Sequence, residues 1–324
     1  MAKDLTYVNG IIAVKETGLL KDKILAFCEM SADGAFRALG ESGFLKNTDI
    51  TSVFDYEKVL RADEADIDEF TREYAPNNAV STYFFAPRDF HNAKALVKAK
   101  YITADADKML APEGLLSIET LKKEVDGEKV EGVYPELTAA IQSAVELFEK
   151  DGANTSGAEV GKIFEQQLYS CLLTACRHNL LLKKLITKKI DMTNVLIVMR
   201  SNTPEYAANN AISGGKIPLD KLLLLFEENE EKAEQALDKT YLERYWKECF
   251  KTRKTGLPFT KAEKSISALE IDFLSEHRYE LKRSQPFMYY IFRRRTENEN
   301  VRIVLSCLLA GMPADEIKAR LRNF

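Results

Sequence analysis

Apolar residues recur along most of this chain every three or four positions, the spacing of one face of an α-helix. The stretch 162–188 contains neither Gly nor Pro and predicts one helix about 40 Å long, at roughly 1.5 Å per residue. Its apolar positions are Phe164, Leu168, Leu172, Ala175, Leu182, Leu185 and Ile186. Two further long helices are predicted over 230–252 and 260–282. The apolar run 195–199 fits a strand when taken alone, but its place in the repeat described below favours a helix.

Several helix starts are marked by capping residues. Ser156 with Glu159, and Thr260 with Glu263, fit capping boxes, in which a hydroxyl and a carboxylate satisfy free backbone N–H groups reciprocally. Thr203-Pro204-Glu205 combines an N-cap, a proline at the first helical position and an acid in the first turn. These signals predict helices that begin near 157, 204 and 261.

Three segments share the pattern acid-x-x-Asn at what the pattern predicts to be the start of an apolar helix. They are Asp89-Phe90-His91-Asn92, Asp191-Met192-Thr193-Asn194 and Glu297-Asn298-Glu299-Asn300, and their acids lie 102 and 106 residues apart. Each has an acid 25 to 27 residues upstream, and each has a glycine before a helix start downstream. The upstream acids are Glu64, Glu165 and Glu270, and the downstream glycines are Gly114, Gly215 and Gly311.

The shared order and nearly fixed offsets favour an internal repeat over accidental similarity among amphipathic helices. We therefore predict an all-α fold of three pseudo-equivalent helical repeats, closed into a funnel-shaped pseudo-threefold body. The chain is expected to form a single body, with repeats at approximately 1–125, 126–228 and 229–324. The acid and the Asn lie on one helix face in each motif. They are expected either to cap the helix locally or to form a polar ring around the axis that receives a partner.

Composition agrees with a helical chain and excludes several classes of function. Gly (15) and Pro (9) are scarce for 324 residues, which argues against barrels and sandwiches. The net charge of −4 predicts no broad attraction to nucleic acid or anionic lipid. The N-terminus lacks an apolar signal core, and the longest uncharged stretch, 74–87, is shorter than the roughly 20 residues of a spanning helix. Five irregularly spaced cysteines favour free, buried thiols in a reducing cytoplasm.

No pattern of catalytic residues is evident. Gly214-Gly215-Lys216 is followed by Ile217, where a phosphate loop needs Ser or Thr, and Asn210 occupies the position of its first glycine. The three histidines are far apart in sequence, and nothing local orients His91 as a general base. We expect no active site, no metal and no cofactor.

The C-terminal stretch 286–303, from Pro286-Phe287-Met288 through Arg293-Arg294-Arg295 to the third motif, resembles the third repeat of the C subunit of the A/V-type rotary ATPases, which is the d subunit in eukaryotes. The N-terminal Tyr7-Val8-Asn9-Gly10, followed by Leu19-Leu20, is similar to that family's opening signature. The resemblance covers essentially the whole chain.

The resemblance implies a non-catalytic central-stalk subunit of an A/V-type rotary ATPase or ATP synthase. Such a subunit is peripheral on the cytoplasmic face of the membrane, without insertion into it. It is a socket that links the central rotor shaft to the membrane proteolipid ring and transmits rotation for ATP-coupled proton or sodium transport. One alternative is a free-standing helical adaptor that binds a partner helix in its groove. Another is an enzyme whose carboxylates converge only in space.

Carried onto this sequence, the resemblance places the acids and asparagines of the three motifs near the funnel axis, and it makes four arginines candidates for pairing with carboxylates in the funnel or on a partner. The predicted partner-binding residues are Asp89, Asn92, Asp191, Asn194, Arg293, Arg294, Arg295, Glu297, Asn300 and Arg302. For the arginines, a solvated face or ion pairs within the chain is the alternative. Leu196 stands in the second repeat where Lys94 and Arg302 stand in the others, so the repeats are not expected to act equally.

Overall fold

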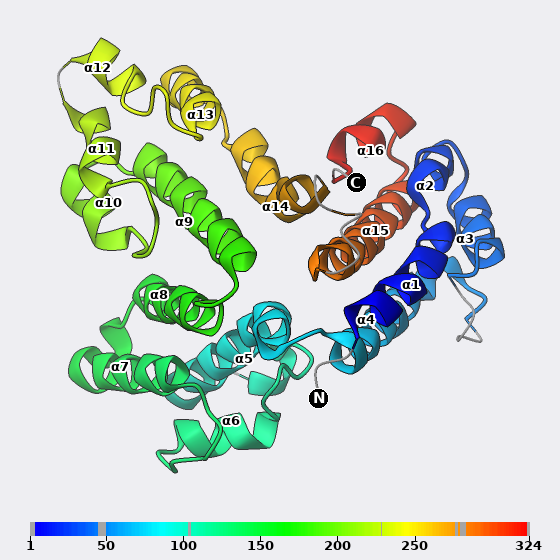
Figure 1. Cartoon of the computed structure of the whole chain (residues 1–324), viewed down its shortest axis with the longest axis horizontal. Helices are drawn as coiled ribbons and strands as arrows, with labels where there is room; N and C mark the ends of the chain where they lie inside the picture. The colour runs from blue at the N-terminus through cyan, green and yellow to red at the C-terminus, as the bar shows by residue number, and fades with distance from the viewer. Residues whose placement is uncertain are drawn as a thin grey trace. The chain divides into compact units, whose positions relative to one another are not determined.

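A computed structural model describes residues 4–44, 50–102, 105–227, 229–275, 278 and 283–322 (Figure 1). Within these residues the regular secondary structure is helical and contains no strand, which confirms the predicted all-α class. None of the helices in this described part is both long enough and apolar enough to cross a bilayer. The predicted arrangement of three repeats about an axis stays a prediction.

The chain folds into two compact units, the first formed by residues 1–77 and 267–324 and the second by residues 78–266. The helices of the first unit are α1 (Leu5–Lys15), α2 (Lys21–Phe27), α3 (Ala32–Glu41), α4 (Tyr56–Tyr74), α15 (Gln285–Leu309) and α16 (Ala314–Arg320). The helices of the second are α5 (Asn78–Tyr101), α6 (Ile118–Val125), α7 (Pro135–Asp151), α8 (Gly157–Ala175), α9 (Leu180–Arg200), α10 (Pro204–Asn210), α11 (Leu219–Leu223), α12 (Glu230–Glu234) and α13 (Glu243–Thr255). The remaining helix, α14 (Thr260–Ser275), crosses the boundary between them.

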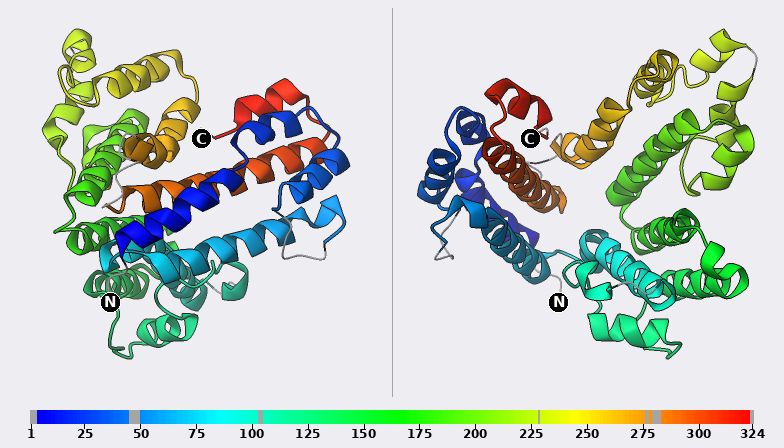
Figure 2. Two further views of the ribbon diagram at one scale, coloured as in Figure 1. Left: turned by 45° about the vertical axis from the view of Figure 1, so that its right-hand side comes forward. Right: turned by 180° about the vertical axis from the view of Figure 1, so that it is seen from behind.

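Helix α15 is the central element of the first unit. It packs against α1, α2, α3, α4 and α16, and Figure 2 shows α1 running alongside it. Val301, Val304 and Leu305 of α15 join Ile24 of α2 and Leu60 of α4 in one buried apolar core. The N-terminal and C-terminal parts of the chain therefore share a core, which holds both of them to one helix.

Two long helices organise the second unit. Helix α5 packs against α6, α7 and α8, and α9 packs against α8, α10, α11 and α13. Phe85 and Phe90 of α5 and Leu182 of α9 are almost fully buried. A helix that is covered by neighbours on several sides carries apolar residues over most of its circumference. The run 195–199 lies inside α9, which confirms that it is helical.

The predicted helix over 162–188 is wrong in one respect, because the structure divides it into α8 and α9. Helix α8 ends at Ala175, and Asn179 begins α9 as its N-cap, since its side chain accepts a hydrogen bond from the backbone N–H of Leu182 at 3.2 Å. An Asn at this position satisfies one of the free N–H groups of a new helix. The residues between α8 and α9 include no Gly or Pro, so the apolar spacing alone predicted one continuous helix. The predicted starts at Ser156 and Thr203 are confirmed.

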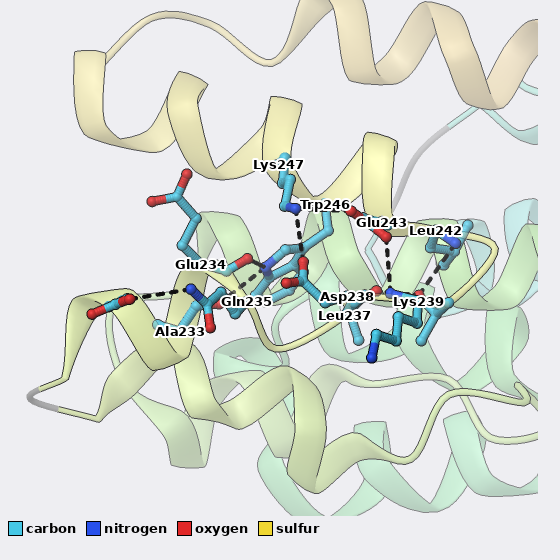
Figure 3. Close-up of polar contacts among 12 residues, drawn as sticks. Ala233, Glu234, Gln235, Leu237, Asp238, Lys239, Leu242, Glu243, Trp246 and Lys247 are labelled. Carbon is cyan, nitrogen blue, oxygen red and sulfur yellow. Dashed lines mark hydrogen bonds and ion pairs between the residues drawn. The ribbon is translucent and has the colours of Figure 1, made fainter.

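The predicted helix over 230–252 is also interrupted, between Glu234 and Glu243. Trp246, which is fully buried, donates its indole N–H to the carbonyls of Ala233 and Glu234 at 3.0 and 3.1 Å. Figure 3 shows this indole at the end of α12, where carbonyl groups lack helical partners. Lys239 in the intervening turn has a positive φ of 60°, and its N–H donates to Glu243 at 2.8 Å. The third predicted helix ends at Ser275, and 276–277 and 279–282 lie outside the described residues.

Candidate functional site

The first acid-x-x-Asn motif binds the loop that follows its own helix. Asn92 accepts a hydrogen bond from the N–H of Ala111 at 2.8 Å and donates to the carbonyl of the same residue at 3.1 Å. Asp89, one helical turn earlier, accepts from the N–H groups of Leu115 and Leu116 at 3.0 and 3.1 Å. The two side chains hold the backbone between α5 and α6 at four points. We call this arrangement a backbone clamp.

The second motif makes the same set of bonds. Asn194 accepts from the N–H of Ile212 at 2.7 Å and donates to its carbonyl at 2.8 Å. Asp191 accepts from the N–H groups of Lys216 and Ile217, both at 3.0 Å. The loop before α11 is therefore held to α9 as the loop before α6 is held to α5. The first two motifs therefore make equivalent bonds.

The third motif forms a clamp from the two ends of the chain. Asn300 accepts from the N–H of Arg322 at 2.7 Å and donates to its carbonyl at 3.2 Å. Glu297, however, accepts from the N–H of Leu20 at 2.8 Å. The sequence analysis paired this motif with Gly311, but the structure puts Gly18-Leu19-Leu20 in the place that Gly114-Leu115-Leu116 takes in the first clamp. The bond between Leu20 and Glu297 joins residues 277 positions apart, which sequence spacing could not indicate.

The clamp side chains lie inside the units. Asp89, Asn92, Asp191, Glu297 and Asn300 have no exposed surface, and Asn194 is 5% exposed. They lie in the middle of helices of 24, 21 and 25 residues, so the prediction that they begin and cap a helix is wrong. The carboxylates of Asp89 and Asp191 instead accept from N–H groups in the loops just before α6 and α11, and the carboxylate of Glu297 accepts from Leu20, the N-cap residue of α2.

Two tyrosines that the sequence analysis missed complete the first two clamps. Tyr134 donates its hydroxyl to Asp89 at 3.4 Å, and Tyr241 donates to Asp191. Burial, together with the neighbouring carboxylate, raises the pKa of both phenols well above the ordinary value of 10, so both remain donors. The available signal was positional, since the tyrosines follow the acids by 45 and 50 residues.

Two glycines allow the backbone to approach the acids. A Cβ atom at Gly114 would overlap the carboxylate of Asp89, and one at Gly215 would overlap that of Asp191. At Gly18, beside the third clamp, a Cβ would meet nothing within 4 Å. The third acid is Glu, whose side chain is longer by one methylene, so it bonds a backbone that need not come as close.

The comparison with known proteins decides the family. The profile of the ATP synthase (C/AC39) subunit family matches residues 8–320. The chain belongs to this family. It is also similar to the C subunit of the V-type sodium ATPase of Enterococcus hirae, with 22% identity over 286 residues that cover 83% of this chain and 82% of that protein. The resemblance to the C subunit of the A/V-type rotary ATPases is thereby confirmed.

Three of the four predicted arginines of this C/AC39 subunit pair with acids of α4. Arg294 bonds Asp63, Arg295 lies 3.2 Å from Asp68, and Arg302 lies 3.0 Å from Glu57 and 3.2 Å from Glu64. Asn298 adds hydrogen bonds to the carbonyl of Leu60 and to Asp63, at 3.0 and 3.1 Å. The arginines thus form ion pairs within the chain, the alternative given above, and they join α15 to α4.

Arg293 differs from the other arginines of the cluster. It is 4% exposed, and its guanidinium lies 5.9 Å from the centroid of the Tyr289 ring.

None of the ten predicted residues lies in a group of His, Cys, Asp and Glu that could hold a metal, and the structure contains no such group of three or more among its described residues. His91 contacts the carbonyl of Met109 at 3.0 Å. All five cysteines are buried and carry no disulfide, as predicted.

Glu297 is a buried acid beside a cation. Desolvation raises its pKa from 4.5 to about 7, while Arg294 and the N–H of Leu20 act in the opposite direction. Its carboxylate lies 3.5 Å from the guanidinium of Arg294. The native state therefore holds a proton on this group at pH values where the unfolded chain has lost it.

Replacing Gly114 with Ala should lower the free energy of unfolding by about 1–3 kcal/mol, because the new methyl group displaces Asp89 from its backbone partners. Gly161→Ala is the matched control, since a Cβ there would meet nothing within 4 Å and the residue lies inside α8. It should be neutral or stabilising by up to about 1 kcal/mol. Urea unfolding measures both, and equal stability of the two variants would contradict the clamp.

Replacing Asn194 with Asp should cost about 2 kcal/mol of stability, because the carboxylate cannot donate to the buried carbonyl of Ile212. Asn210→Asp removes a similar bond, to the carbonyl of Tyr206 at 2.8 Å, at an exposed site. This control should stay within about 0.5 kcal/mol of the unmodified chain. Thermal unfolding at neutral pH compares the two variants. If Asn194→Asp lost no more stability than Asn210→Asp, the bond from Asn194 to Ile212 would be dispensable.

Replacing Glu297 with Gln should flatten the pH dependence of stability between pH 5 and pH 7. The raised pKa means that the native state binds more protons than the unfolded state in this interval, so the stability of the unmodified chain falls as pH rises. Gln keeps an acceptor for the Leu20 N–H and removes the titration. Urea unfolding at both pH values should show the variant losing about 2 kcal/mol less than the unmodified chain over this interval. Parallel pH profiles would refute this role.

Proposed function

We propose that this chain is a non-catalytic central-stalk subunit of an A/V-type rotary ATPase or ATP synthase. In this role it is a socket that links the central rotor shaft to the membrane proteolipid ring and transmits rotation for ATP-coupled proton or sodium transport. The observation that carries the proposal is the family match over residues 8–320, almost the full length of the chain. The similarity to the C subunit of the V-type sodium ATPase over 83% of the chain supports it.

The clamps agree with a mechanical role. A body that passes torque must not extend or unwind at its loops, and each clamp fixes a loop to a long buried helix through hydrogen bonds to backbone groups. Buried bonds of this kind cost about 1–3 kcal/mol each when one partner is removed. In the first unit, the third clamp ties Leu20 and Arg322 to the same helix, α15. Load applied near either end of the chain would pass directly into that helix.

The proposal includes the organisation and location of the chain. The three related repeats, at approximately 1–125, 126–228 and 229–324, are proposed to close into one body. This body is proposed to sit on the cytoplasmic face of the membrane as a peripheral member of the complex. A socket between a shaft and a membrane ring needs no membrane-spanning helix of its own, which agrees with the helices of the described part.

The partner-binding role predicted for the ten residues stays a prediction. The burial of the six clamp residues favours an indirect form of it, in which they set the shape of the loops that a partner meets. Arg294, Arg295 and Arg302 form ion pairs with α4, so reversing their charge would disturb the fold as well as any partner. Substitutions in these residues are therefore a poor test of binding.

A pull-down of the tagged chain from detergent-solubilised membranes should recover both shaft and proteolipid-ring subunits. Deleting the chain should abolish ATP-driven ion transport in membrane vesicles, while the detached head still hydrolyses ATP, and restoring the chain should restore transport. A soluble complex that contains a partner helix but no ring would favour the free-standing adaptor. Recovery of neither shaft nor ring would refute the proposal.

A further inference from the structure

A cleft of about 640 Å³ opens on the second unit between α5, α8, α9 and α10. Lys94, Lys162 and Arg200 are among its lining residues, and Glu165 is the one carboxylate among them. Arg200 is ion-paired with Glu263 outside the lining, so Lys94 and Lys162 against Glu165 leave the cleft positively charged on a chain whose overall net charge is −4. Buried Phe164 and half-buried Leu168 add apolar surface to the same wall.

The first unit contains a helix pair related to the one that forms this cleft. Helix α4 packs on α15 as α8 packs on α5, and Arg302 and Lys94 each follow the acid of their motif by five residues. Arg302 is paired with two acids of α4, Glu57 at 3.0 Å and Glu64 at 3.2 Å. The pair α4–α15 therefore shows what a cation five residues after the motif acid binds when both acids of the neighbouring helix are present.

In the cleft, one of those two acids is missing. Glu165 corresponds to Glu64; desolvation raises its pKa above 4.5, and the charge of Lys94 acts against that rise. Seven residues before each of these acids stand Ala158 and Glu57, so Ala158 occupies the place of the second carboxylate. Ala158 is exposed and lines the cleft. The cleft thus has a cation, an apolar wall and room at the position where the related interface has an acid.

The form of the cleft suits a helix. Its lining residues on α8 include Ala158, Lys162, Glu165 and Leu168, which lie three or four positions apart and extend over about 15 Å at roughly 1.5 Å per residue. Those on α5, Pro87, Phe90 and Lys94, are spaced in the same way. Two helix faces with this spacing form a groove into which the side chains of a third helix can pack.

We propose that this cleft binds an acidic helix of the central rotor shaft, with one of its carboxylates beside Lys94 in the place that Glu57 takes beside Arg302. The proposal rests on the proposed function for the identity of the partner. Charge complementarity of this kind speeds association and fixes the register of the bound helix. Binding should accordingly weaken as the salt concentration rises.

Two substitutions test the cleft from opposite directions. Lys94→Glu reverses the charge that receives the carboxylate, and Ala158→Glu supplies the missing carboxylate from the chain itself. Ala158 lies in the first turn of α8, where an acid is favourable to the helix dipole, so this variant should fold as well as the unmodified chain. Lys150→Glu is the matched control, because it makes the same charge reversal at an exposed site on α7 outside the cleft.

Binding of the purified shaft subunits to the full chain is the measurement, with circular dichroism and thermal unfolding to verify the fold. Lys94→Glu and Ala158→Glu should each weaken binding at least about tenfold, and Lys150→Glu should change it less than about twofold. Unmodified affinity in both cleft variants would overturn this assignment, even with the proposed function intact. Loss of ring binding instead of shaft binding would also overturn it. If the unmodified chain bound neither shaft nor ring, the proposed function itself would fail.

Discussion

The structure depends on one interaction that is made by each of the three motifs, the buried clamp of an Asn and an acid on backbone groups. An Asn carboxamide can donate and accept at once, so it can satisfy both the N–H and the carbonyl of a single residue. The acid one turn away accepts from backbone N–H groups just before, or at, the N-cap of another helix. Loops that would otherwise need water or sheet partners are fixed to the long helices α5, α9 and α15.

The third clamp shows how the repeat accommodates the ends of the chain. Its Asn holds the backbone near the C-terminus, and its acid holds the backbone after α1, so two distant segments supply what one loop supplies elsewhere. The change from Asp to Glu accompanies a change in the approaching backbone, which no longer requires a glycine. The same comparison between repeats exposes a difference at Lys94. Its counterpart Arg302 has two acids, whereas Lys94 has one and borders an open cleft.

The sequence predicted the all-helical class and the family, and a motif that occurs three times singled out the six clamp residues, although it assigned them to helix caps or to a polar ring rather than to loop backbone. It did not predict the pairing of Glu297 with Leu20, since residues so far apart meet only through tertiary packing. The breaks at Asn179 and around Lys239 were missed because their residues are neither Gly nor Pro. Asn179 could nevertheless have been recognised from the sequence as a candidate N-cap. The role of Trp246 could not be inferred, because it depends on which carbonyls the end of α12 presents.

The central claim is that this chain turns with the rotor, and a covalent link to the ring tests it most directly. The five native cysteines are buried, so a cysteine introduced on an exposed helix and another on a neighbouring proteolipid can be joined selectively. A link of this chain to the ring should leave ATP-driven ion transport intact, because the two would rotate together. Loss of transport on forming that link, with recovery on reduction, would contradict the account.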